Sequence, residues 1–338
     1  MKAAFVDPMG LDNLRTVDLP DPTPGDNEVL VALKYASLNY RDILAVNGGY
    51  GRMQKQEKLI PLSDGAGEVI GVGSKVREWK VGDRVVSCFF PDWQAGPLRP
   101  EAVRTDLGGM FDGVAVEKRV FRSDALVKVP DSVDLRDAST LTCAAATAWN
   151  AVIEAGKVGP GERVLVQGTG GVSLFALQFA VAAGAEVYAT VSSPEKADLV
   201  KSLGAAHVVN YREDSDWGKT VMKMTGGRGI DHVVEIGGAE TLKQSMLSLK
   251  LEGNIYMIGV VTGPKAELNV PIIAMSGTTI RGISAGSRLS LKRMVDAIAH
   301  HKMKPVIDQS SFTLDTLKDA LLHLKSGKHT GKVVIEVR

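Results

Sequence analysis

Residues 163–173 read RVLVQGTGGVS, a short run rich in β-branched residues that ends in a cluster of glycines. The helical pattern VSLFALQFAVAAG follows directly. A strand, a tight glycine turn and a helix N-terminus are the parts that bind the pyrophosphate of a dinucleotide. Glycine permits the sharp turn and lets the backbone approach a phosphate, and Ser173 stands where the usual third glycine would be. The pattern therefore predicts cofactor contacts at Gly168, Thr169, Gly170, Gly171 and Val172.

Six apolar strand-like segments continue this pattern. They are RVLVQ, EVYATV, HVVNY, HVVEIG, NIYMIG and TIRGIS, which start at positions 163, 186, 207, 232, 254 and 279. Each spacing leaves room for one crossover helix. One such helix is well marked, because Ser193 caps it, Pro194 fills its first turn and Gly204 ends it. The segments predict an α/β fold with a doubly wound parallel sheet covered on both faces.

Composition narrows the function classes. The 338 residues carry 40 basic and 39 acidic side chains, so net charge gives no electrostatic reason to bind nucleic acid or an anionic membrane. Two cysteines, Cys88 and Cys143, make no disulfide framework, which suits a reducing cytoplasm. The start MKAAFVDPMG has no apolar signal core, and polar residues interrupt the most apolar window, 172–191. We therefore expect a cytoplasmic protein with room for two domains.

The first 130 residues have a different sequence pattern. Short alternating runs separated by Gly, Pro and Asp predict an antiparallel β-rich domain, and residues 91–113 are expected to form a long surface loop. After residue 286 the pattern predicts an amphipathic helix, LSLKRMVDAIAHH, a second helix near 314–326 and a final strand, KVVIEV. The C-terminal part is expected to complete the first domain. The division predicted is 1–130 with 287–338, and 131–286.

Four stretches resemble one known family along essentially the whole chain. They are SLNYRD at 37–42, PLSDGAGEVIGVG at 61–73 with VGDRVV at 81–86, TCAAATAWNAV at 142–152, and VLVQGTGGVSLFALQFA at 164–180. The chain resembles the medium-chain dehydrogenase/reductase superfamily. That resemblance implies a GroES-like catalytic domain, a Rossmann domain for a nicotinamide cofactor, and a cleft between them for a small-molecule substrate. It also implies a homodimer joined through the edge segment TIRGIS.

The metal distinguishes subfamilies. Zinc alcohol dehydrogenases of this superfamily hold catalytic zinc with a cysteine, a histidine and a second cysteine, and the matching positions here are Asn39, Ser63 and Cys143. An amide and a hydroxyl are poor zinc ligands. All six histidines lie at 207 or later, and the four-cysteine run of structural zinc is missing. Asp42 and Asp64 could join Cys143 around a metal, but the sequence favours a member with no metal site.

Relatives without zinc that carry an LN(Y/F)RD segment resemble quinone oxidoreductases and reductases of enones or enals. Their hydride transfer needs no Lewis acid. The protein contributes by orienting the reactants, excluding water and donating hydrogen bonds to the developing oxyanion. Asn39 is a candidate donor to a substrate carbonyl or to the nicotinamide, and Tyr50 a candidate proton donor. The alternatives are an Asn39 that satisfies buried backbone groups and a Tyr50 that is an ordinary loop aromatic. Asp42 is expected to pair with Arg41 as a structural residue.

The residues that follow the second strand of the predicted sheet indicate which cofactor is preferred. They include Ser192, Ser193 and Lys196. Rossmann domains that prefer NAD place an acid at that strand's tip, whereas hydroxyls and a lysine suit a 2′-phosphate. Glu195 leaves the preference ambiguous, because it is acidic but lies one helical turn after the position of an NAD-selecting acid. Tyr211 matches a position where quinone-reductase relatives contact the adenosine phosphate, although it could simply pack at a strand end. NADPH is favoured over NADH.

Motif matches imply further cofactor contacts. Tyr40 and Thr147 correspond to family positions near the nicotinamide and pyrophosphate. Lys332, in HTGKVV, falls where relatives place a basic residue on the pyrophosphate; the alternative is a solvated terminal lysine. The positions expected to line the nicotinamide half are Gly237, Ile258 and Val260.

The sequence thus predicts an NADPH-dependent oxidoreductase that transfers hydride to a quinone or an activated alkene without zinc. One alternative is an alcohol dehydrogenase that acts on a small alcohol and aldehyde pair. Another, from a different class, is a nucleotide-binding protein that does not catalyse a reaction.

Overall fold

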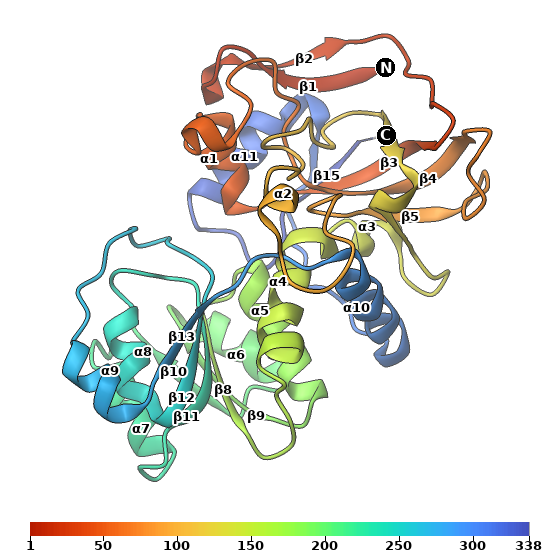
Figure 1. Ribbon diagram of the computed structural model, residues 1–338. Coiled ribbons are helices and arrows are strands. Elements are labelled where there is room, and N and C mark those ends of the chain that lie inside the picture. The colour runs from red at the N-terminus through yellow and green to blue at the C-terminus, as the bar shows by residue number, and fades with distance from the viewer. Residues whose placement is uncertain (338) are drawn as a thin grey trace. The chain divides into compact units, whose positions relative to one another are not determined.

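The computed structural model describes residues 1–337, which divide into two compact units (Figure 1). Unit 1 contains Met1–Ala146 and the chain from Ala285 onward, and unit 2 is Thr147–Ser284. Residues 131–146 therefore belong to unit 1, although the sequence assigned them to the second domain. Polar contacts hold this segment there: Ser37 Oγ donates to Ser139 O at 2.9 Å, and Thr142 Oγ1 donates to Ser87 O at 2.8 Å.

Unit 2 is the predicted doubly wound sheet. Its strands lie in the order β10-β9-β8-β11-β12-β13 and every neighbouring pair is parallel, with helices on both faces (Figure 1). All six predicted strands are confirmed. The strands are β8 (Arg163–Gln167), β9 (Glu186–Val191), β10 (His207–Asn210), β11 (Ile230–Glu235), β12 (Leu249–Met257) and β13 (Thr279–Gly282). The helices are η5 (Asn150–Ala155), α5 (Gly171–Ala182), α6 (Pro194–Ser202), α7 (Trp217–Met224), α8 (Leu242–Ser248) and α9 (Val270–Ser276), and α4 (Ala146–Trp149) spans the boundary.

Unit 1 is the predicted β-rich domain. Its main sheet has the order β14-β15-β3-β4-β5-β7, with β6 also paired to β3, and the pairs are antiparallel except β14 with β15. The C-terminal strand returns as expected, because Ile335 pairs with Ala36 of β3. The strands are β1 (Lys2–Val6), β2 (Leu14–Asp18), β3 (Glu28–Ser37), β4 (Asp64–Val72), β5 (Arg84–Ser87), β6 (Lys118–Arg122), β7 (Leu126–Lys128), β14 (Phe312–Thr313) and β15 (Val334–Glu336).

Short helices connect these strands and cover the sheet. The helices predicted after residue 286 are present as α10 and α11, and Ser287 caps α10 by accepting from Ser290 N. The helices of unit 1 are η1 (Leu11–Asn13), α1 (Tyr40–Val46), η2 (Gly51–Met53), α2 (Pro100–Val103), η3 (Ser123–Ala125), α3 (Leu135–Ala138), the π-helical turn η4 (Leu141–Ala145), α10 (Arg288–His301), η6 (Leu314–Thr316) and α11 (Leu317–Lys325). Within residues 1–337, no helix has the length and apolarity that crossing a membrane requires.

Segment 91–113 is only partly the surface loop that was expected. It contains α2, and its residues 105–109 are buried. Glycines allow this burial: a Cβ on Gly108 would lie 2.7 Å from the backbone of Leu62, and Gly108 has a φ of 68°. The segment thus packs against unit 1 and brings Asp106 and Leu107 close to α1.

Candidate cofactor and active sites

The turn between β8 and α5 contains two glycines that differ in backbone conformation. Gly168 has a φ of 71°, a conformation that favours glycine, whereas Gly170 has an ordinary φ of −77°. A Cβ on Gly170 would meet no atom within 4 Å, so the protein's own packing does not require glycine there. Ser173 closes the strand onto the helix, since its buried hydroxyl donates to Gln167 O at 2.6 Å. Because the first N–H groups of a helix lack intrahelical partners, the N-terminus of α5 offers donors to an anion.

A buried carboxylate fixes the backbone after β11, and the sequence did not single it out. Glu235 accepts from Gly237 N at 2.8 Å, from Gly238 N at 2.9 Å and from the hydroxyl of Thr241 at 2.5 Å. Its other oxygen accepts from Gln167 Nε2 at 2.8 Å and from Ser245 Oγ. The available signal was an acid as the last residue of an apolar strand. These hydrogen bonds hold the backbone at Gly237, an expected nicotinamide contact.

The predicted 2′-phosphate residues follow β9. Ser193 caps α6, accepting from Lys196 N at 3.4 Å, so its capping role is confirmed. A hydrogen bond with the Ser193 hydroxyl lowers the pKa of Glu195 and brings a negative charge beside that hydroxyl. Tyr211 N bonds to Val191 O at 3.0 Å, and the Tyr211 side chain is 42% exposed. These residues, with Ser192, gather at the carboxyl ends of β9 and β10.

The other expected cofactor contacts are divided between the units. Ile258 N donates to Glu235 O at 2.9 Å, and Val260 is exposed just beyond β12. Thr147 is buried in α4 and belongs to unit 2, whereas Tyr40 is exposed at the start of α1 in unit 1. A cofactor role for each of these four residues stays a prediction.

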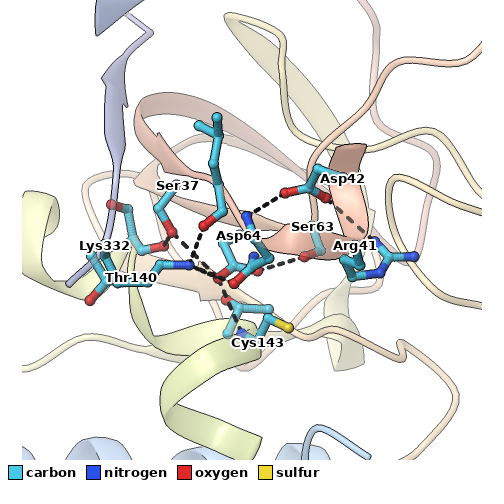
Figure 2. A network of polar contacts seen from close by, with 12 residues as sticks. Ser37, Arg41, Asp42, Ser63, Asp64, Thr140, Cys143 and Lys332 are labelled. Atoms are coloured by element: carbon cyan, nitrogen blue, oxygen red, sulfur yellow. Dashed lines mark hydrogen bonds and ion pairs between the residues drawn. The ribbon is translucent and has the colours of Figure 1, made fainter. Parts of the chain in front are cut away.

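Asp64 is the centre of a buried polar network in unit 1 (Figure 2). One carboxylate oxygen accepts from Ser63 Oγ at 2.6 Å. The other accepts from Cys143 N at 3.2 Å and from Lys332 Nζ at 3.4 Å, and lies 3.4 Å from Ser37 Oγ. This carboxylate thus connects the end of β3, the start of β4, the π-helical turn η4 and the approach to β15.

Lys332 is a buried cation. Only 2% of the residue is exposed, and its ammonium donates to Leu38 O at 2.7 Å and to Asn39 Oδ1 at 2.6 Å in addition to Asp64. The alternative of a solvated terminal lysine is therefore wrong, because the C-terminal strand carries this side chain into the interior beside β3. A contact with the cofactor pyrophosphate stays a prediction.

Asn39 stands at the N-cap of α1 with one half of its amide engaged. Its Oδ1 accepts from Lys332, and its backbone N–H donates to Asp42 Oδ2 at 2.7 Å. Its Nδ2 is buried and has no hydrogen-bond partner within residues 1–337. A buried amide donor without a partner is unusual in a folded protein and indicates a missing acceptor, such as a ligand oxygen.

Arg41 forms a second cluster beside this network. Its guanidinium lies 3.7 Å from Asp42, donates to Leu107 O at 2.9 Å and also bonds to Asp106. The expected pairing of Asp42 with Arg41 is confirmed. Burial raises the pKa of Asp42 to about 6, and the nearby charge of Asp64 adds to that rise.

Tyr50 lies beside the same guanidinium. The carbon of the Arg41 guanidinium is 5.7 Å from the centre of the Tyr50 ring and 4.7 Å from that of Phe89. Burial raises the pKa of Tyr50, yet the residue remains 36% exposed. The phenol is therefore placed next to the polar cluster and is still accessible.

The three positions that match zinc ligands in relatives each contact Lys332 or Asp64. Asn39 gives its oxygen to Lys332, and the hydroxyl of Ser63 donates to Asp64. Burial raises the pKa of the Cys143 thiol, and its backbone N–H donates to Asp64 at 3.2 Å. Within residues 1–337 there is no group of three His, Cys, Asp or Glu side chains arranged to hold a metal ion.

Comparison with known proteins places these two units in one family. Residues 25–131 match the model of the alcohol dehydrogenase GroES-like domain, and residues 171–300 match that of the zinc-binding dehydrogenases. A zinc-type alcohol dehydrogenase-like protein of Schizosaccharomyces pombe is 42% identical over 97% of this chain and 96% of its own length. The acryloyl-coenzyme A reductase of Sulfurisphaera tokodaii is 29% identical over 99% of this chain and 100% of its own.

Among solved structures, an NAD-dependent alcohol dehydrogenase superposes with a TM-score of 0.91 at 30% identity, covering 100% of both chains. The likeness extends over both units, and the glycine turn that the dinucleotide requires is intact. The chain is therefore an oxidoreductase of the medium-chain dehydrogenase/reductase superfamily, and it depends on a nicotinamide cofactor.

Proposed function

We propose that this protein is an NADPH-dependent reductase that transfers hydride to a quinone or to an activated alkene, an enone or enal, without zinc. The observation that carries the proposal is Lys332. Its ammonium lies 2.6 Å from Asn39 Oδ1 and 3.4 Å from Asp64. A lysine of the chain itself therefore supplies positive charge beside the positions that match zinc ligands. The acryloyl group in the name of one relative is itself an activated alkene.

Each group of candidate residues has its own role in this proposal. Bound nicotinamide supplies the hydride. The turn at Gly170 and the first N–H groups of α5 would hold the pyrophosphate, and Lys196 would hold the 2′-phosphate. Asn39 Nδ2 donates to the carbonyl oxygen of the substrate, on which negative charge develops as hydride adds to the conjugated carbon. Tyr50 delivers the proton, directly or through water.

Metal analysis and a substrate panel test this proposal. We expect no stoichiometric zinc, no loss of activity with a chelator, turnover of quinones, enones or enals with NADPH, and poor oxidation of simple alcohols. Without a Lewis acid, little would stabilise an alkoxide before hydride leaves. One tightly bound zinc per chain that is lost together with activity would overturn the proposal.

The second candidate function is an alcohol dehydrogenase, because two of the proteins compared above are named as alcohol dehydrogenases or as similar to them. Efficient oxidation of simple alcohols, with no turnover of enones or quinones, would favour it. A protein that binds NADPH tightly but turns over no substrate in the panel would instead be a non-catalytic nucleotide-binding protein.

Asn39→Ala should lower kcat/KM by up to a hundred- to a thousand-fold. That range corresponds to about 2.7–4 kcal/mol for one donor to an oxyanion in a dry site. Tyr50→Phe should cost less, because water can replace a lost proton donor. Steady-state kinetics on the best substrate check both values. An Asn39→Ala variant with full activity would show that the amide does not contact the reacting oxygen.

We also propose a homodimer in the cytoplasm. Strand β13 is the edge of the unit 2 sheet, and all four of its residues are exposed, so its free backbone groups can pair with a second copy. Sedimentation equilibrium should give twice the 36.0 kDa mass of the chain. A monomer at micromolar concentration would exclude this part of the proposal.

A further inference from the structure

The three N–H groups of the Lys332 ammonium have three acceptors. They are the carbonyl of Leu38 at 2.7 Å, the side-chain oxygen of Asn39 at 2.6 Å and the carboxylate of Asp64 at 3.4 Å. Leu38 and Asn39 lie at the junction between β3 and α1, whereas Lys332 enters from just before β15. Since the side chain is buried, this cation is held in one place.

This arrangement fixes which end of the Asn39 amide faces outward. An ammonium can only donate, so the amide must present its oxygen to Lys332 and cannot turn its NH₂ group that way. The main chain of Asn39 is fixed as well, because its N–H donates to Asp42 Oδ2 at 2.7 Å. With the main chain and the amide oxygen both held, the NH₂ group can only point away from Lys332, and this is the atom that lacks a partner.

The charge of Lys332 also acts on the amide electronically. A cation bonded to an amide oxygen draws electron density from the nitrogen, which makes the N–H groups stronger donors. Asp64 balances the charge of the ammonium from another side, so the buried pair is neutral as a whole. A positive charge is thus held one amide group away from any acceptor of the Asn39 N–H.

We propose that Lys332 is a positioning residue that orients and polarises the Asn39 amide toward the oxygen of the substrate. It performs by hydrogen bonding, through one side chain, what a metal ion performs by direct coordination. This inference rests on the proposed function, in which Asn39 contacts the reacting carbonyl. Its rival is a Lys332 that serves only to neutralise Asp64 and has no part in turnover.

A double-mutant cycle distinguishes the positioning role of Lys332 from a role in charge neutralisation alone. Lys332→Met should lower kcat by about ten- to a hundred-fold with little change in the dissociation constant of NADPH. Asn39→Ala alone should cost more, and Lys332→Met combined with Asn39→Ala should be no slower than Asn39→Ala within about three-fold, because Lys332 acts through the amide. Lys328→Met, at an exposed position on the same approach to β15, is the matched control and should retain full activity.

The inference would be overturned if the loss of kcat in the double variant equalled the product of the losses in the two single variants. An unchanged kcat in Lys332→Met would also overturn it. So would a loss that falls on NADPH affinity alone, which would assign Lys332 to the pyrophosphate. If Asn39→Ala itself retains full activity, the proposed function fails at its donor. If Asn39→Ala is impaired but the cycle is multiplicative, only the positioning role fails.

Lys332→Met leaves the Asp64 carboxylate buried without its counter-charge, and this variant can fail to fold. Lys332→Met with Asp64→Asn removes both charges and keeps the shape of the network. The double variant should melt at a temperature closer to that of the wild type than Lys332→Met does. Its kcat should stay low. Recovery of wild-type kcat in this neutral pair would show that charge balance was the whole role of Lys332, and would overturn the inference.

Discussion

Lys196 is the residue on which the proposed preference for NADPH depends. It stands in the first turn of α6 beside Ser193, at the end of β9. A charged hydrogen bond to the 2′-phosphate contributes about 1.5–3 kcal/mol, so Lys196→Ala should weaken NADPH binding about ten- to a hundred-fold and leave NADH unaffected. Lys201→Ala, at an exposed position on the same helix, is the control. Equal losses with NADPH and NADH in fluorescence titrations would exclude a 2′-phosphate contact.

At the scale of single residues, the sequence singled out candidate members of the site but not the contacts that they make. The motif SLNYRD singled out Asn39, and Tyr50 followed from its loop. The buried role of Lys332 could not be predicted, because its partners Asp64 and Asn39 are 268 and 293 residues away in the chain. Such contacts depend on how the C-terminal strand returns to β3, and local sequence patterns carry no information about that distance.

At the scale of elements, the two glycines of the β8–α5 turn should behave differently. Gly170→Ala should leave the melting temperature nearly unchanged, since its φ is ordinary and its Cβ would meet open space, but the added methyl should sharply weaken NADPH binding. Gly168→Ala should destabilise unit 2 by about 1–2 kcal/mol, because its φ is 71°. Thermal unfolding without cofactor and NADPH titration measure the two effects. Full NADPH affinity in Gly170→Ala would place the pyrophosphate elsewhere.

Elements with a regular pattern were predictable, and irregular ones were not. The six strands of unit 2 follow from their apolar runs, and Ser193, Pro194 and Gly204 mark α6 at both ends. Segments 91–113 and 131–146 have no such period. Their places are set by tertiary contacts, such as the Arg41 bond to Asp106 and the Thr142 bond to Ser87, which local patterns do not reveal.

At the scale of the whole molecule, the buried Asp42 should make stability depend on pH. Its pKa is about 6 in the folded protein and 3.8 in a model carboxyl group, so the folded state binds the extra proton between these values. Stability from this group is therefore present below pH 4 and is lost as pH rises through 6, by at most about 3 kcal/mol. Asp42→Asn escapes this loss.

Urea unfolding of the wild type and Asp42→Asn at pH 4, 5, 6 and 7 checks this dependence. The unfolding free energy of the variant should gain on that of the wild type as pH rises, and the comparison cancels other titrating groups shared by the two proteins. A difference that stays constant with pH would show that folding does not raise the pKa of Asp42.

Neither cysteine of this chain should react with the electrophiles on which we propose the enzyme acts. Enones, enals and quinones are Michael acceptors that alkylate thiolates, but burial raises the pKa of both Cys88 and Cys143 to about 12. Cys88 is buried and Cys143 is partly buried, and burial disfavours the thiolate form that attacks such acceptors. Mass spectrometry after incubation with N-ethylmaleimide should find the native protein almost unmodified and the urea-unfolded protein modified twice. Rapid modification of the native protein would contradict this. The fold would thus let the enzyme process alkylating substrates without inactivating itself.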